Sequence, residues 1–221
     1  MSGWLALVGG HEWTDGCRPI DEILLKESGA KDVVLVPTAA AYEQPGKTIE
    51  AATAYFGSLG VTVRALDLLT RPAASDDANV HALKGASLVY FADGSPLHLR
   101  SVLKDTPCWD ALVAAWANGT GVAGTGAGAM VLGDPMVDPR GGAFTLGLGL
   151  LPSMAAMTQT HDWHDETKRR TIQLANKGLP LIAVDDATAA MRSPNGDWSI
   201  VGVGGATVYC NGEEGDLSLL P

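Results

Sequence analysis

The sequence has few cysteines and little positive charge. Its three cysteines, Cys17, Cys108 and Cys210, are far apart and form no Cys-x-x-Cys pair, so neither a disulfide framework nor a cysteine zinc motif is expected. This pattern fits a reducing cytoplasm. The chain has 15 Lys and Arg residues and 25 Asp and Glu residues, which gives a net charge of −10. Nucleic acids and anionic membranes are bound through positive patches, so neither is an expected partner.

Long apolar runs are also missing. No stretch approaches the roughly 20 apolar residues that a membrane-spanning helix needs, and the run at residues 4–8 is too short, and lacks the basic flank, for a signal peptide. Apolar residues make up 46% of the chain and charged residues 18%, which is typical of a folded protein. The chain is therefore expected to be soluble and cytoplasmic, with one domain over residues 1–221.

Short apolar runs alternate with longer amphipathic segments in the first half of the chain. The runs predict strands at residues 4–8, 33–36, 61–65, 88–91 and 121–123, with helices between several of them and a polar loop at 70–78. Further strands are predicted at 181–184, 189–192, 199–203 and 207–210, after a mostly helical segment at 162–176. The pattern predicts an α/β fold, a doubly wound, mostly parallel sheet sandwiched by helices, with a β-rich C-terminal tail.

Residues 124–128 read Gly-Thr-Gly-Ala-Gly, at the end of the fifth predicted strand. This is the frame of a nucleophile elbow, Gly-x-Ser-x-Gly, in which a strained strand-to-helix turn exposes a serine hydroxyl. Gly126 stands at the serine position and has no side chain. The alternative is a glycine-rich turn for a phosphate, but the turn comes too late for a dinucleotide fingerprint and lacks the lysine of a P-loop.

Three more patches carry polar residues. Asp93 to Ser95 follow a predicted strand, at the sheet edge where ligands bind, or simply form a capped turn. His164 is a candidate general base, although His161 competes for that role and an isolated surface histidine is usually inert. Asp186 follows another strand and either orients a histidine or caps a turn.

Taken in order, these four patches resemble one family. The sequence reads Phe-Ala-Asp-Gly-Ser-Pro at 91–96, Gly-Thr-Gly-Ala-Gly-Ala at 124–129, Asp-Trp-His at 162–164 and Val-Asp-Asp-Ala-Thr-Ala at 184–189. It is similar to the serine peptidases of the cyanophycinase and dipeptidase E (aspartyl dipeptidase) type, which have a class I glutamine amidotransferase-like fold. The resemblance implies Asp-Xaa or β-aspartyl peptides as the substrate class. The similarity covers almost the whole chain.

The resemblance implies a role for each matched residue. Gly126 stands at the nucleophile position, His164 matches the general base and Asp186 the acid. The backbone N–H groups of Gly94 and Ala127 match the oxyanion hole. The positions expected near the substrate are Asp93, Ser95, Thr125, Lys168 and Arg170. No metal and no cofactor are expected, and the family suggests a homodimer.

Two departures from the family pattern coincide. The nucleophile is missing at Gly126, and Asp93 and Pro96 replace a glycine and a glutamine of the family's loop. The favoured hypothesis is therefore a catalytically dead or impaired homologue that keeps a pocket for a small peptide or amino-acid-like ligand. The alternative is an active hydrolase of small acidic peptides that uses Ser95, Thr125 or a water. A glycine introduced to trap substrate is disfavoured by the second departure.

Overall fold

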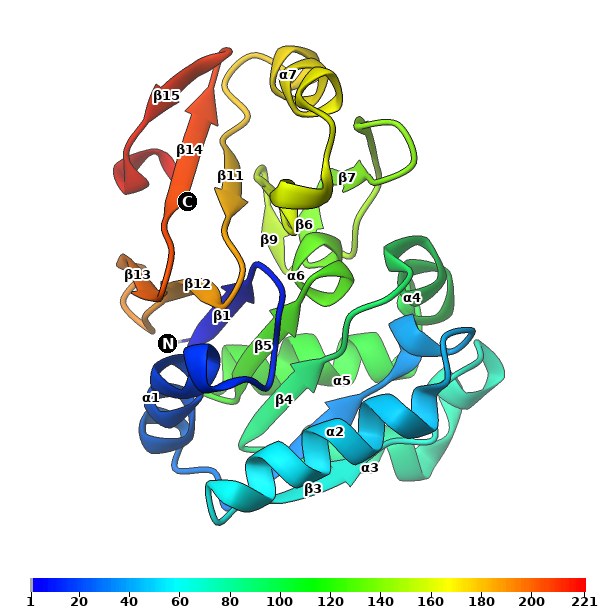
Figure 1. Cartoon of the computed structure of the whole chain (residues 1–221). Coiled ribbons are helices and arrows are strands. Elements are labelled where there is room, and N and C mark those ends of the chain that lie inside the picture. The colour runs from blue at the N-terminus through cyan, green and yellow to red at the C-terminus, as the bar shows by residue number, and fades with distance from the viewer. Residues whose placement is uncertain (1) are drawn as a thin grey trace.

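The fold is described by a computed structural model that places residues 2–221. Within this range the centre is a seven-stranded sheet of order β13-β12-β1-β5-β4-β2-β3 (Figure 1). Strands from β1 to β3 in this order are parallel, whereas β12 pairs antiparallel with β1 and β13. The strands are β1 Leu5–Val8, β2 Asp32–Val36, β3 Thr62–Ala65, β4 Leu88–Phe91, β5 Gly121–Thr125, β12 Thr188–Arg192 and β13 Trp198–Gly202. The predicted doubly wound, mostly parallel sheet is confirmed.

Helices cover both faces of this sheet because successive strand side chains point to opposite sides. Leu5 and Leu7 of β1 belong to an apolar cluster with α3 and α5, whereas Ala6 and Val8 belong to a cluster with α1 and α2. The helices are α1 Arg18–Ser28, α2 Pro45–Ser58, α3 Asp77–Lys84, α4 Pro96–Leu103, α5 Pro107–Ala117, α6 Ala127–Val131 and α7 Asp165–Leu174. In the described residues no helix is both long and apolar enough to cross a bilayer.

The C-terminal third builds a smaller structure above one end of the main sheet (Figure 1). Its four-stranded sheet has the order β10-β11-β14-β15, formed by β10 Ala155–Met157, β11 Leu181–Val184, β14 Ala206–Cys210 and β15 Glu213–Gly215. Two short strand pairs, β6 Gly133–Asp134 with β9 Leu151–Pro152 and β7 Met136–Asp138 with β8 Ala143–Thr145, lie beside it. The β14–β15 hairpin turns at Asn211 and Gly212, both at positive φ, as an Asn-Gly turn requires.

Two predicted elements differ from the structure. Residues 70–78, expected as a loop, contain the 3-10 turn η3 (Pro72–Ser75) and the start of α3. The Asp76 side chain accepts a hydrogen bond from the Ala78 N–H, so acidic residues that suggested a loop in fact cap a helix. The segment 162–176, predicted to be mostly helical, contains α7 over Asp165–Leu174, and its first residue belongs to a separate 3-10 turn, η4 (Thr160–Asp162).

Asp21 on α1 gives a prediction about stability. Its side chain is buried, the Tyr55 hydroxyl donates a 2.8 Å hydrogen bond to Oδ2, and Oδ1 has no partner in the described residues. Burial raises the pKa of the Asp21 carboxyl from 3.8 to about 7. Ionising Asp21 is therefore less favourable in the folded protein than in the unfolded one, by about 1.4 kcal/mol per unit of pKa difference.

The contribution of Asp21 to stability is therefore expected to fall as pH rises from about 4 through about 7. Asp21→Asn removes this charge. The change that it causes in the free energy of unfolding should be more stabilising at pH 8 than at pH 4.5, by a few kcal/mol. Urea unfolding of both proteins at the two pH values measures the difference. An equal effect of the substitution at both pH values would contradict a neutral buried carboxyl.

Candidate active site at the carboxyl edge of the sheet

The elbow predicted at residues 124–128 is present as a strand–turn–helix. Strand β5 ends at Thr125, Gly126 has φ 51° and ψ −116°, and α6 begins at Ala127. Positive φ at the turn favours glycine. Glycine is also needed at Gly124, because a Cβ there would overlap the backbone of Gly128. The strand and helix of the elbow therefore pack at the close distance that the motif requires.

The carboxylate of Asp93 occupies the space in front of Gly126. A Cβ on Gly126 would overlap Asp93 Oδ1 and Cγ. Asp93 Oδ1 accepts a 2.7 Å hydrogen bond from the Ala127 N–H, and Oδ2 accepts a 2.6 Å hydrogen bond from the Gln159 amide. Asp93 therefore takes the place of a nucleophile side chain and also satisfies an N–H group that was expected to bind an oxyanion.

The loop that carries Asp93 joins β4 to α4 and faces the elbow. Gly94 has φ 133°, and a Cβ there would overlap the backbone of Ala39. The Ser95 N–H donates to Ala39 O at 2.9 Å, while its hydroxyl accepts from the His98 N–H and caps α4. Ser95 thus serves as the helix cap that sequence reasoning had offered as the alternative to a substrate contact.

Asp186 is paired with His161. The Nδ1 atom of His161 lies 2.8 Å from Asp186 Oδ2. The expected base, His164, is exposed at the N-cap of α7, and its side chain makes no hydrogen bond or ion pair within residues 2–221. The pairing of His164 with Asp186 that the motif implied is therefore absent. The η4 turn brings His161, rather than His164, to Asp186. Motif spacing alone does not reveal this.

The loop after β1 supplies two residues that sequence reasoning missed, His11 and Glu12. The Thr125 hydroxyl is fully buried and donates to Glu12 Oε2 at 3.1 Å. Burial raises the pKa of the Glu12 carboxyl, and the nearby charge of Asp93 raises it further. Both residues follow Gly9 and Gly10 at the carboxyl end of a parallel strand, the same signal that identified Asp93.

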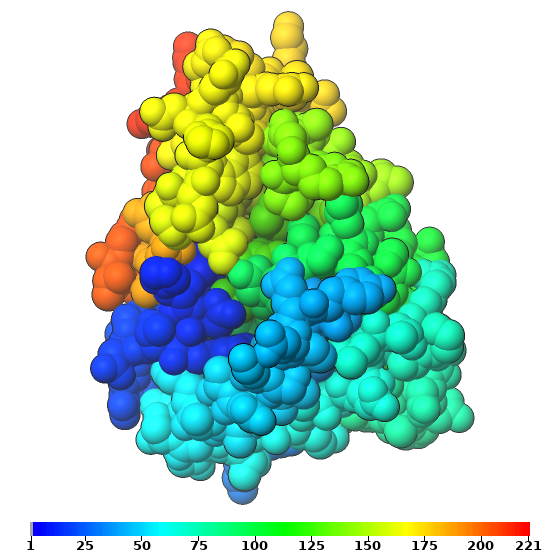
Figure 2. Space-filling view, turned by 45° about the vertical axis from the view of Figure 1, so that its right-hand side comes forward, coloured from blue at the N-terminus to red at the C-terminus, as the bar shows by residue number. Residues whose placement is uncertain are grey.

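Segments distant in sequence meet here. Figure 2 shows the yellow region of η4 and α7 directly above the blue region that follows β1, and the backbone N–H of Gln159 donates to Gly9 O at 2.8 Å.

Two cavities of about 390 Å³ each open at this edge. The first is lined by Glu12, Trp13, Ala40, Glu43, Lys47, Thr48, Ala51, Asp93 and Gly94. The second is lined by Thr160, His161, Lys168, Asp185 and Asp186. Arg170 is exposed and lines neither cavity.

Known proteins share this sequence pattern and fold. A model of peptidase family S51 matches residues 5–193. The cyanophycinase of Synechococcus elongatus is 24% identical over 219 residues, covering 93% of this chain and 67% of its own. The cyanophycinase of a Nostoc species is 25% identical over 213 residues, covering 91% of this chain and 72% of its own.

Solved structures agree with the sequence comparison. A peptidase from an acI-B1 Actinobacterium is 26% identical with a TM-score of 0.86, covering 97% of this chain and 93% of that one. A putative peptidase E protein from Listeria monocytogenes EGD-e has the same fold, with a TM-score of 0.71 at 17% identity over 92% of this chain and all of that one. On the strength of the match over residues 5–193, the chain belongs to peptidase family S51.

Proposed function

We propose that this protein is a family S51 member that has lost serine-peptidase chemistry and binds a small, positively charged, amino-acid-like ligand. The observation that carries the proposal is the position of Asp93. Its carboxylate lies where a nucleophile side chain would project from Gly126 and accepts the Ala127 N–H. A substrate carbonyl oxygen would have to displace a hydrogen-bonded carboxylate to reach that donor.

The hydroxyl groups near the elbow do not replace the missing serine. Thr125 is fully buried and its hydroxyl is bonded to Glu12. Ser95 caps α4. Losing the nucleophile of a catalytic triad lowers turnover about a million-fold. These contacts favour a binding role over hydrolysis by Ser95 or Thr125.

The charges around the first cavity favour a cationic ligand. Glu12, Glu43 and Asp93 line the cavity together with a single cation, Lys47. An amino acid fits this pattern if its ammonium group lies at Glu12 and Asp93 and its carboxylate at Lys47, because charge-assisted hydrogen bonds are the stronger ones. A second positive group, on a basic side chain of the ligand, would lie near Glu43. A dicarboxylic ligand would add negative charge to a site already rich in it.

Calorimetric titration with L-arginine and L-lysine, beside L-aspartate and L-glutamate, tests the proposal. The basic amino acids are expected to bind and the acidic ones not. Glu12→Gln should weaken binding by about 10-fold or more, since a hydrogen bond to a charged group contributes about 1.5–3 kcal/mol.

Glu50→Gln is the matched control. Glu50 is exposed on α2 and lines neither cavity, so the same loss of charge should leave affinity nearly unchanged. Tighter binding of the acidic amino acids, or equal effects of the two substitutions, would refute the proposed ligand class.

A further inference from the structure

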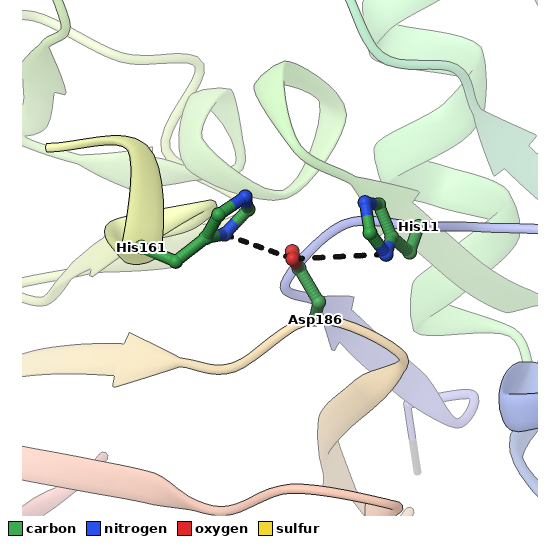
Figure 3. A group of neighbouring side chains, drawn as sticks. All are labelled: His11, His161 and Asp186. Carbon is green, nitrogen blue, oxygen red and sulfur yellow. Dashed lines mark ion pairs between the residues drawn. The ribbon is translucent and has the colours of Figure 1, made fainter.

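We propose that His11, His161 and Asp186 form a binding site for a divalent transition metal, with Zn²⁺ the best match. The three side chains come from the loop after β1, from η4 and from the turn between β11 and β12, and they point toward one another (Figure 3). Each offers one ligand atom, and these atoms all lie within 4.8 Å of one another. Two imidazoles and a carboxylate are a donor set that zinc accepts.

The distances from Asp186 Oδ2 to the two histidine nitrogens lie on either side of the ligand–ligand distance in a tetrahedral zinc site. Zinc bonds of about 2.0–2.1 Å place two ligand atoms roughly 3.3–3.5 Å apart. Asp186 Oδ2 lies 2.8 Å from His161 Nδ1 and 3.8 Å from His11 Nδ1. The longer distance exceeds that of a hydrogen bond, so a shared proton does not explain why His11 converges on this oxygen. The His11 side chain is 69% exposed and is free to move inward.

The second ring nitrogen of His161 supports the same interpretation. Its Nε2 atom lies 3.1 Å from Asp162 Oδ1, so both ring nitrogens face carboxylates. A neutral imidazole has one N–H to donate. If Asp162 receives it, Nδ1 and Asp186 Oδ2 are two acceptors in contact, and a cation between them removes the repulsion. Carboxylate–histidine–metal contacts of this kind are the usual outer shell of a zinc ligand.

Asp186 itself has unsatisfied polar capacity. Its Oδ1 atom is buried and has no hydrogen-bond partner in the described residues, and it is packed so closely against Gly10 that a Cβ there would overlap it. A buried carboxylate oxygen without a hydrogen-bond donor is costly. A bound cation offsets this cost.

One side of the cluster opens onto the second cavity, where Lys168 and Asp185 join His161 and Asp186. Three protein ligands with an open fourth position are typical of catalytic rather than structural zinc sites. An ion held there supplies Lewis acidity, and Lys168 can hold an anionic group beside it. This site goes beyond the proposed amino-acid binding, which uses the other cavity.

Titration of the tag-free protein with Zn²⁺, and with Co²⁺ followed by visible absorption, tests the site. We expect one ion per chain. His11→Ala and His161→Ala should each lower Zn²⁺ affinity by more than about 100-fold, because changes in the outer shell alone cost about 10–100-fold. Asp162→Asn, which changes only the outer shell, should lower Zn²⁺ affinity by about 10–100-fold.

His81→Ala is the matched control, since His81 is exposed on α3 and should leave affinity unchanged. Circular dichroism checks that each variant is folded. Native protein that binds no Zn²⁺, or His11→Ala protein that binds it as tightly as native, would overturn the assignment. Because no peptide is present, either result leaves the proposed loss of serine chemistry untouched.

Discussion

Gly126→Ser is expected to lower the free energy of unfolding by about 3 kcal/mol. A side chain at φ 51° and ψ −116° costs about 1–3 kcal/mol in backbone strain. The new Cβ also overlaps Asp93 Oδ1 and Cγ, so the carboxylate must move. Its hydrogen bond from the Ala127 N–H would then be lost, and such a bond to a charged group is worth about 1.5–3 kcal/mol.

A double-mutant cycle separates the two costs. Adding Asp93→Gly to Gly126→Ser removes the overlap, so the combined loss should be smaller than the sum of the single losses. Gly57→Ser is the control, because a Cβ at this exposed position on α2 meets no atom within 4 Å. Urea unfolding of the four proteins and the control gives the coupling energy. Additive losses would mean that Asp93 does not occupy the nucleophile's place.

Restoring both positions together is expected to produce peptidase activity that neither substitution gives alone. The native protein has glycine at the serine position of the motif, and the loss of a triad nucleophile lowers turnover about a million-fold. Gly126→Ser alone still carries the displaced Asp93 carboxylate beside the Ala127 N–H, where its negative charge opposes an oxyanion, and an oxyanion donor of this kind is worth about 10²–10³-fold. The Asp93→Gly/Gly126→Ser double variant supplies the hydroxyl and removes the carboxylate. It should exceed Gly126→Ser by at least about 100-fold.

The histidine that serves the restored serine can be identified in the same assay. With EDTA present, adding His161→Ala should abolish the gained activity, because His161 is the histidine paired with Asp186. Adding His164→Ala should leave it, since His164 is exposed and unpaired in the part of the chain that the structure describes. The opposite outcome would identify His164 as the base, as the motif spacing predicts, and would contradict the role given to His161.

The main sheet could be predicted from sequence because buried parallel strands are short continuous apolar runs. Leu88–Phe91 of the main sheet matches its predicted bounds, and so does Leu181–Val184 of the four-stranded sheet. Polar residues or proline lie close to both ends of each run. The elbow followed from its glycines, which the close approach of β5 and α6 requires. Helix α3 was missed because Asp76 and Asp77 signal a turn as readily as a helix start.

The side-chain arrangement of the site was less predictable. His11 and Glu12 lie more than a hundred residues from Thr125 and His161, so only the tertiary fold brings them together. Gln159 carried no signal in the sequence, yet it donates to Asp93. Motif spacing selected His164, and the η4 turn instead directs His161 to Asp186. Asp93 was recognised as a departure from the family, but its occupation of the nucleophile's space became visible only in three dimensions.

The most direct test of the account is the rate at which native protein, in EDTA, hydrolyses Asp-Xaa and β-aspartyl dipeptides, the substrates that the family resemblance suggests. Release of the free amine is measured beside the Asp93→Gly/Gly126→Ser double variant. We expect no turnover by native protein above the buffer blank and measurable turnover by the double variant. Turnover by native protein, above all turnover lost in Asp93→Asn, would contradict it and make the Asp93 carboxylate a reactive group.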